Sequence, residues 1–412
     1  MIKIFNSISI YKILLFSLLV RLSLFPFFSD TFLENEWGVI FHNFKISGIL
    51  GYNVAINDYL AVPKLADAGQ KVLPSVFMPP LYIFLIFVFE FFFSNFVKLT
   101  NFVIIFQIFL SLASIYMFYE ILKIFEIEKK LVLILCSIFA FFPLNIYAAL
   151  QISSVTLQIF LIVTFFLFLF RYEKNNNFLN LFLFSLASGL LILTRGEFFI
   201  FYILTVFYFF GYLKFRLKTI VISLIISTLI ISPYLKRNYN NFDTLVLTKS
   251  FGYNLLKGNN PSFKVEGDSN FIEKNYDREN LSIEADNFYE IKLDNFYKTE
   301  AIRIIKNEPF EYFKFFFIKV FSFLLFDFNS TYPNYYNFFH LFPKILISLT
   351  CLFGAILALK KKGFYQYLAL YYFSNIFLFS FFFILPRYSL ILLPVQLILS
   401  LVFFNFLRKF FN

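Results

Sequence analysis

The chain has 412 residues and a net charge of +11, and 60% of its residues are hydrophobic. Its mean hydropathy of +0.75 excludes an ordinary soluble domain, which has no use for so much apolar surface. Basic residues gathered on a soluble face would indicate nucleic-acid binding. The long apolar runs leave no such face, so the positive charge points to loops beside anionic lipid.

A membrane-spanning helix needs roughly 17–25 apolar residues, and runs of this kind recur along the chain. The first run, Ile13 to Phe28, follows Lys3 and Lys12 and lacks a small-x-small cleavage site, so we expect a retained helix rather than a signal peptide. Ten spans are predicted, at 10–29, 98–122, 131–150, 155–171, 178–194, 197–213, 218–235, 342–359, 365–385 and 388–407.

Two further apolar segments, 78–94 and 310–327, each follow a long polar stretch. We expect both to be re-entrant or interfacial helices on the outer face, because only then do the basic short loops all lie on one side. The number of spans would be twelve if both segments crossed.

Residues 30–75 and 236–309 are the two long polar stretches, with 17 of the 25 acidic residues and 14 of the 36 basic ones. Because short basic loops stay on the cytoplasmic side, this asymmetry places both stretches outside. The predicted fold is an all-α polytopic membrane protein of about 10–12 transmembrane helices. It forms one domain over 1–412, with a first outer loop over 30–75 and a second outer loop, or cap, over 236–309.

Within the second loop, apolar residues recur at helical spacing from Tyr289 to Ile305, which predicts a helix that docks on the membrane or on the spans. The two cysteines, Cys136 and Cys351, both lie in apolar runs. They form neither a disulfide framework nor a metal motif, and His42 and His340 are too far apart in sequence to suggest a metal pair.

Carboxylates gather just beyond the first predicted helix, where Asp30, Glu34 and Glu36 precede Trp37. A carboxylate at a membrane boundary can act as a general base on an acceptor hydroxyl or amine, or hold a divalent metal beside a phosphate. Solvated loop charges are the alternative. Further along, the prolines of Pro79-Pro80-Leu81-Tyr82 fix an extended start to the next helix.

Basic motifs lie at the outer ends of three predicted spans. They contain Arg195 with Glu197, then Lys236 with Arg237, and finally Arg387. Arginine makes bidentate contacts to phosphate, and basic residues outside oppose the positive-inside tendency, so we expect an anion site. Snorkelling at helix ends is the alternative.

The stretch from Gly252 to Pro261 follows the second basic motif. It contains Tyr253 and Lys257, and its turn Gly258-Asn259-Asn260-Pro261 exposes backbone N–H groups that can bind an anion.

In this order, the motifs resemble those of the GT-C superfamily of membrane glycosyltransferases. The closest likeness is to the bacterial group related to protein O-mannosyltransferases and aminoarabinose transferases. It spans nearly the whole chain, from Glu36-Trp37 through Pro79-Pro80-Leu81-Tyr82 and Leu193-Thr194-Arg195-Gly196-Glu197 to Pro386-Arg387-Tyr388.

The resemblance implies a polyprenyl-phosphate sugar as the donor and transfer to a glycan, lipid or protein acceptor on the outer face of the bacterial inner membrane. A first-loop carboxylate, Glu36 or Glu34, would be the base. The residues implied to bind the phosphate are Arg195, Lys236, Arg237, Lys257 and Arg387. Those implied to line the pocket are Trp37, Tyr82, Tyr253 and Asn259.

The family commonly has Asp in the first acidic motif, and Trp37 favours Glu36 over Glu34 for that position. The family often has a second outer carboxylate, but the matching stretch, Gln151 to Leu157, contains no acid. No cofactor is certain, and a divalent metal remains an open expectation.

Two other functions stay open at this stage. A polysaccharide polymerase or ligase acting on a lipid-pyrophosphate donor also needs outer arginines, but not the acidic first loop. A flippase or transporter predicts ionisable residues buried in mid-span. Here most charges lie at span ends or outside, with Arg21 and Glu120 as partial exceptions.

Overall fold

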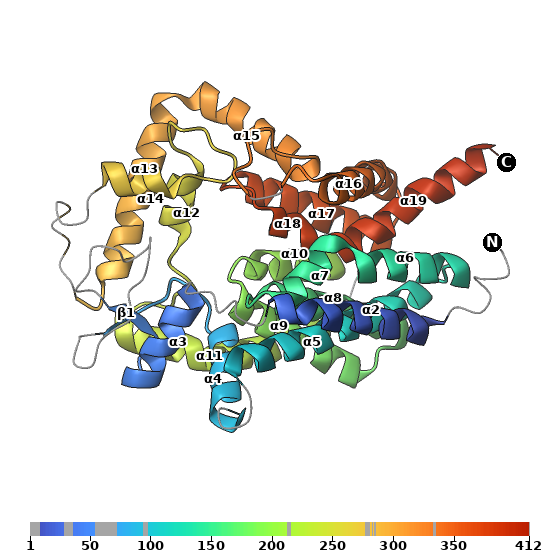
Figure 1. The fold of residues 1–412 in the computed structure, drawn as a ribbon, viewed down its shortest axis with the longest axis horizontal. Coiled ribbons are helices and arrows are strands. Elements are labelled where there is room, and N and C mark those ends of the chain that lie inside the picture. The colour runs from blue at the N-terminus through green and yellow to red at the C-terminus, as the bar shows by residue number, and fades with distance from the viewer. Residues whose placement is uncertain are drawn as a thin grey trace.

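The computed structural model describes residues 9–28, 36–53, 72–93, 98–211, 216–276, 281, 283, 286–332 and 335–411. These residues are mostly helical. Most helices run side by side along the long axis, as Figure 1 shows. Helix α2 begins and α19 ends at the right-hand end of this view, whereas α12, α13 and α14 cover the opposite end.

Before the second polar stretch the elements are α2 (Ile10–Leu24), the 3-10 turn η1 (Phe25–Phe27), α3 (Glu36–Ser47), β1 (Gly51–Asn53), β2 (Val72–Pro74), α4 (Leu81–Phe93), α5 (Leu99–Ile124), α6 (Lys129–Phe141), α7 (Pro143–Leu150), α8 (Val155–Asn175), α9 (Phe178–Thr194), α10 (Phe198–Gly211) and α11 (Leu217–Phe242). The later elements are α12 (Phe251–Gly258), α13 (Ser269–Asn275), α14 (Tyr289–Asn307), α15 (Pro309–Leu324), α16 (Phe338–Ala358), α17 (Phe364–Ser380), α18 (Pro386–Leu390) and α19 (Leu393–Phe411).

Within the described residues, five helices are long and apolar enough to cross a membrane, namely α2 with η1, α5, α8, α11 and α16. The bent pair of α6 and α7 would be a sixth. The chain is therefore an all-helical, multi-pass membrane protein in its main features. Helices α9 and α10 are apolar but have only 17 and 14 residues, so the number of ten spans stays a prediction.

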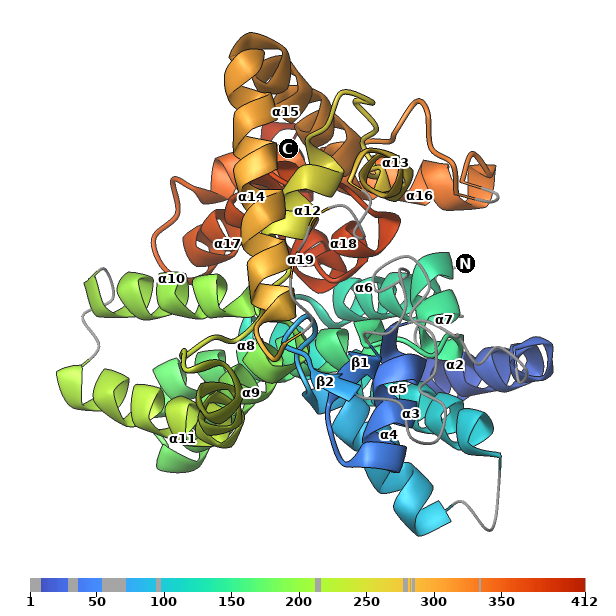
Figure 2. The same cartoon turned by 90° about the vertical axis from the view of Figure 1, so that its left-hand side faces the viewer.

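Helix α4 lies across the direction of α2 and α5 in both views (Figures 1 and 2). Its 13 residues extend about 20 Å at 1.5 Å per residue, less than the roughly 30 Å thickness of the apolar core of a bilayer. The described part of α4 is therefore too short to cross a bilayer, and the re-entrant or interfacial placement of segment 78–94 stays a prediction.

A break between α6 and α7 interrupts the span predicted over 131–150, and the two helices meet at 49°. Pro143 has no N–H to donate, so helical pairing is lost here. Side chains replace it. Asn145 Nδ2 donates to Phe139 O at 2.8 Å, and Arg21 Nη1 of α2 donates to Ala140 O at 3.1 Å. Arg21 is fully buried, and its hydrogen bond to Ala140 O joins α2 to the end of α6. This mid-span charge therefore has a structural role.

A short antiparallel ribbon of β1 and β2, which the sequence analysis did not predict, lies at the cap end with Gly51 opposite Pro74. Arg237 holds it in place, donating to Leu50 O and Ser75 O at 2.8 Å each. Helix α11 continues through Arg237, beyond its predicted end at 235.

The helix predicted between Tyr289 and Ile305 is confirmed as α14, which buries Leu293, Tyr297 and Ala301. Helix α12 packs closely against it. A Cβ at Gly252 would lie 1.9 Å from the backbone oxygen of Asp294, so only glycine allows this approach. The cap is therefore a packed layer of short helices.

Candidate functional site

Two of the predicted phosphate-binding residues, Lys257 and Arg387, lie near two adjoining aromatic rings, and Arg195 acts electrostatically on one of them. Tyr388 of α18 interacts electrostatically with Arg387, Arg195 and Glu197. The Lys257 ammonium lies 5.0 Å from the centroid of the Phe383 ring, and that ring is 6.1 Å from the ring of Tyr388. We call Arg195, Lys257 and Arg387 the cationic corner.

Local structure presents Arg195 at the end of α9. Its backbone is extended, and its N–H still donates to Leu191 O at 2.8 Å, which closes the helix. A Cβ at the following Gly196 would lie 2.9 Å from the Thr248 hydroxyl, so this turn packs against the segment after α11.

The Arg195 guanidinium has spare hydrogen-bonding capacity. Its Nε is buried and has no hydrogen-bond partner in the part of the chain that the structure describes. Leaving a buried donor unpaired costs roughly 1–3 kcal/mol, more for a charged group. An oxyanion would contact the terminal Nη groups instead, which are not among the buried unpaired atoms and have no hydrogen-bond partner in the described residues.

Arg387 lies at the exposed start of α18, where Pro386 is the first helical residue. Its guanidinium lies 5.9 Å from the centroid of the Tyr388 ring. Tyr388 in turn stacks on Phe379 of α17 at 4.5 Å, so the aromatic support of Arg387 is part of the bundle core. Arg387 can therefore contact a ligand while its ring partner stays fixed.

Arg237 and Lys236 lie elsewhere, on the last turns of α11. Arg237 donates its hydrogen bonds to the backbone beside the β1–β2 ribbon, and its guanidinium also lies 5.6 Å from the centroid of the Phe242 ring. Lys236 is exposed, and within the described residues it has no hydrogen bond or ion pair. The contacts of Arg237 are therefore with the ribbon and with Phe242 rather than with the cationic corner, and Lys236 has no described contact that joins it to the corner.

Two of the four predicted pocket residues are packed into the cap. Tyr253 is buried, and its ring contacts those of Phe77 and Tyr297 at 5.9 and 6.0 Å. Asn259 donates to the backbone oxygens of Leu255 and Phe381, and its Oδ1 accepts from Lys319 Nζ at 2.8 Å. These hydrogen bonds make Asn259 a link between the cap and the end of α17.

Tyr82 is also buried, with 1% of its surface exposed, and its hydroxyl donates to Gln107 Oε1 at 2.7 Å. Gln107 Nε2 then donates to the backbone oxygen of Gln151 at 2.6 Å. Tyr82 thus reaches, through one side chain, the stretch where the resemblance leads us to expect a second carboxylate.

The proposed base and its aromatic neighbour are only partly described. Glu34 lies outside the described residues. Glu36 and Trp37 are the first residues of α3, and their side chains lie outside the described part. Helix α3 packs on α4 through Phe44, whose ring contacts Phe84 and Phe87 at 5.7 and 5.0 Å.

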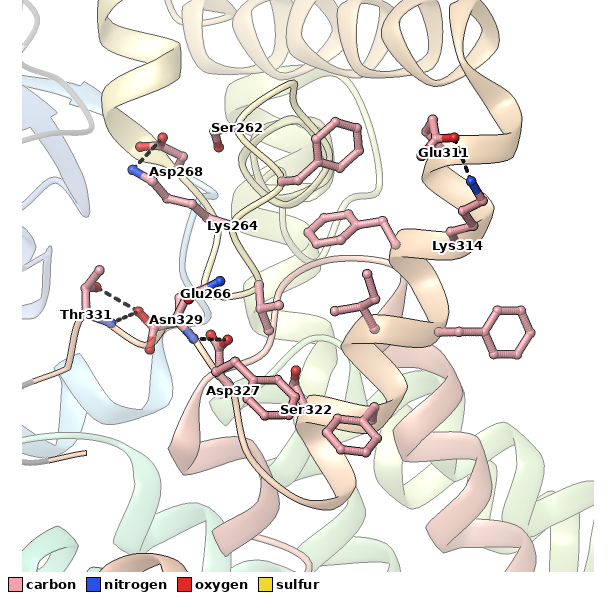
Figure 3. A pocket seen from close by; sticks show the side chains of 18 of the residues that line it. Ser262, Lys264, Glu266, Asp268, Glu311, Lys314, Ser322, Asp327, Asn329 and Thr331 are labelled. Carbon is pink, nitrogen blue, oxygen red and sulfur yellow. Dashed lines mark hydrogen bonds and ion pairs between the residues drawn. The ribbon is translucent and has the colours of Figure 1, made fainter. Parts of the chain in front are cut away.

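A cleft of about 1060 Å³, which no sequence motif predicts, lies between the loop 262–270, helix α15 and the segment 327–331. Figure 3 shows Lys264, Glu266, Asp327 and Asn329 on one side, facing α15. We call it the cap cleft. Since its walls come from separate parts of the chain, no local motif marks it.

Metal ligation finds no support in the described residues, where no group of three His, Cys, Asp or Glu side chains could hold an ion. The chain matches no model of a known protein family, and a comparison with curated proteins finds no significant match.

Proposed function

We propose that this protein is a multi-pass membrane glycosyltransferase of the GT-C type, with its site at the outer face of a bacterial inner membrane. It would transfer a sugar from a polyprenyl-phosphate donor to a glycan, lipid or protein acceptor. The observation that carries the proposal is the cationic corner, in which Lys257 and Arg387 lie near adjoining aromatic rings and Arg195 acts electrostatically on the Tyr388 hydroxyl.

In the proposed reaction, an acceptor oxygen or nitrogen attacks the anomeric carbon of the donor sugar. The bond between that carbon and the phosphate oxygen breaks, and the electron pair leaves with the lipid phosphate. The acceptor proton passes to a first-loop carboxylate, Glu36 or Glu34. Charge on the leaving phosphate is stabilised by the cationic corner, and this contribution matters most because phosphate is already a good leaving group.

Transfer assays in proteoliposomes test the proposal. Arg387→Gln and Arg195→Gln should each lower transfer from a polyprenyl-phosphate sugar about 10- to 100-fold, the equivalent of roughly 1.5–3 kcal/mol for a hydrogen bond to a charged group. Lys236→Gln is the matched control, since this exposed lysine lies in a basic motif outside the corner. Equal activity of all three variants would remove the corner from the mechanism.

The donor distinguishes this proposal from a polymerase or ligase. A polyprenyl-pyrophosphate sugar should be a poor donor and the monophosphate a good one. The opposite preference would favour the polymerase or ligase. Movement of intact lipid-linked glycan across the bilayer without transfer would favour a flippase.

A further inference from the structure

Large apolar side chains and polar side chains both line the cap cleft. On the α15 side, Phe317 and Ile318 expose 54% and 51% of their surface, and on the segment 327–331 Phe328 exposes 65%. Such large apolar groups beside a cavity favour an apolar part of a ligand. The loop 262–270 and the segment 327–331 offer hydroxyl, amide and carboxylate groups (Figure 3).

The cleft carries a net negative charge, and only some of its carboxylates form ion pairs. Four carboxylates and two lysines line it, which gives a net charge of −2. Both lysines are already paired, Lys264 with Asp268 at 2.8 Å and Lys314 with Glu311 at 2.9 Å. The two remaining carboxylates have no ion-pair partner among the described residues. The cleft therefore repels an anionic ligand and favours a neutral or cationic one.

Glu266 is held by the protein itself. It accepts hydrogen bonds from the Ser330 hydroxyl and from the N–H and hydroxyl of Thr331, at 3.0 and 2.7 Å for the latter two. These bonds fix the segment 327–331 against the loop 262–270, and so they hold the side of the cleft that faces α15 together.

Asp327 is the carboxylate left for a ligand. Only 7% of its surface is exposed, and its Oδ1 accepts from the Asn329 N–H at 3.0 Å. Its Oδ2 has no hydrogen-bond partner among the described residues, and the side chain lines the cleft (Figure 3). Lys344 interacts with Asp327 electrostatically, but its Nζ donates to the Tyr335 hydroxyl. Since Oδ2 is not one of the fully buried atoms, a ligand N–H or O–H in the cleft can donate to it.

We propose that the cap cleft binds an amphipathic glycoside, whose sugar is neutral or carries an amine and whose apolar part lies along α15. A sugar has hydroxyl edges that donate to carboxylates and an apolar C–H face that packs on aromatic rings. Within the proposed function this ligand is the acceptor. The cleft can bind this ligand even if the protein does not transfer sugar. A failed binding test would therefore refute the cleft proposal alone, and a failed transfer test would refute the proposed function alone.

The experiment uses the full-length protein in lipid nanodiscs and three short-chain probes with the same alkyl group. These are hexyl glucoside, its 2-amino-2-deoxy analogue and its 6-sulfate, each titrated by calorimetry. We expect saturable binding of the first two, with the amine about tenfold tighter, and the sulfate at least about tenfold weaker than the neutral probe. This comparison needs no variant, so it does not depend on any substitution being tolerated.

Variants then assign the preference to a residue. Asp327→Asn should abolish the tenfold preference for the amine while neutral binding stays within about threefold, and Phe317→Ser should weaken both probes. Glu273→Gln, on the exposed face of α13, is the control and should change neither. No saturable binding of the neutral and amine probes, sulfate binding as tight as the amine, or an unchanged preference in Asp327→Asn would each overturn the proposal.

Discussion

Lys319 gives the most demanding test of how the cap is attached to the bundle. This lysine of α15 is fully buried, and its Nζ donates to Asn259 Oδ1 at 2.8 Å and to Phe382 O at 2.6 Å. Its ammonium also lies 4.4 Å from the centroid of the Phe315 ring. Lys319→Met keeps the length and apolar stem of the side chain but removes the amine, so it isolates the polar contribution.

Burial lowers the pKa of Lys319 from 10.5 to about 7. Above pH 10.5 the amine is neutral in the folded and unfolded states, so there is no penalty. As the pH falls towards 7, the unfolded state takes up a proton that the folded state resists, and stability falls by about 1.4 kcal/mol per pH unit. Over the interval of 3.5 between the two pKa values the loss reaches at most roughly 5 kcal/mol, and it levels off below pH 7.

Lys319→Met should therefore change sign with pH. At about pH 10 the variant has lost two hydrogen bonds of a neutral amine and should be less stable by roughly 1–3 kcal/mol. At about pH 6 it no longer has the cost of a buried ammonium and should match or exceed the parent protein by a few kcal/mol.

The assay is an unfolding titration of detergent-solubilised protein, followed by far-ultraviolet circular dichroism from about pH 6 to about pH 10. The quantity compared is the difference in unfolding free energy between variant and parent, which cancels groups that titrate in both. Lys314→Met on the same helix is the control, because this lysine is exposed and pairs only at the surface. A difference for Lys319→Met that stays constant across the pH range would refute the reasoning.

Other substitutions test the packing. Gly258→Ala should destabilise the cap by about 1–3 kcal/mol, since a Cβ there would lie 2.1 Å from Phe382 O, whereas Gly211→Ala, in open space, should be nearly neutral in thermal unfolding. Arg237→Gln should free the β1–β2 ribbon, and limited proteolysis should then cut the first loop at least several-fold faster. Asn145→Ala should lower the unfolding free energy by about 1–3 kcal/mol, because a carbonyl at the end of α6 loses its donor.

Local patterns were sufficient to predict the helices with clear boundaries. Helix α9 has the predicted range of 178–194 residue for residue, because Asn177 caps its start through the N–H of Leu179 at 2.9 Å and the backbone turns extended at Arg195. Helix α14 was also predictable from the sequence, since its buried apolar residues recur at helical spacing.

Features that depend on contacts distant in sequence were not predictable. The break at Pro143 requires two side chains that pair with the freed carbonyls, and one of them, Arg21, lies 119 residues before the carbonyl it contacts. The extension of α11 to Phe242 was also not predicted, although the bond that stabilises it, from Asn238 Nδ2 to Val246 O at 2.7 Å, is local. The proposed roles of Glu34 and Glu36 stay predictions, since their side chains lie outside the described part.

The cationic corner and the cap cleft have opposite charge. Arg387 of the corner and Glu266 of the cleft both act electrostatically on the Tyr332 hydroxyl. An anionic group is therefore favoured at the corner and repelled from the cleft, whereas an amine has the opposite preference. In a transferase that must hold a lipid phosphate and an acceptor at once, this separation of charge would keep each substrate out of the other's place. Exchanging the charge of one site should thus weaken discrimination between the two substrates more than it weakens binding of either one.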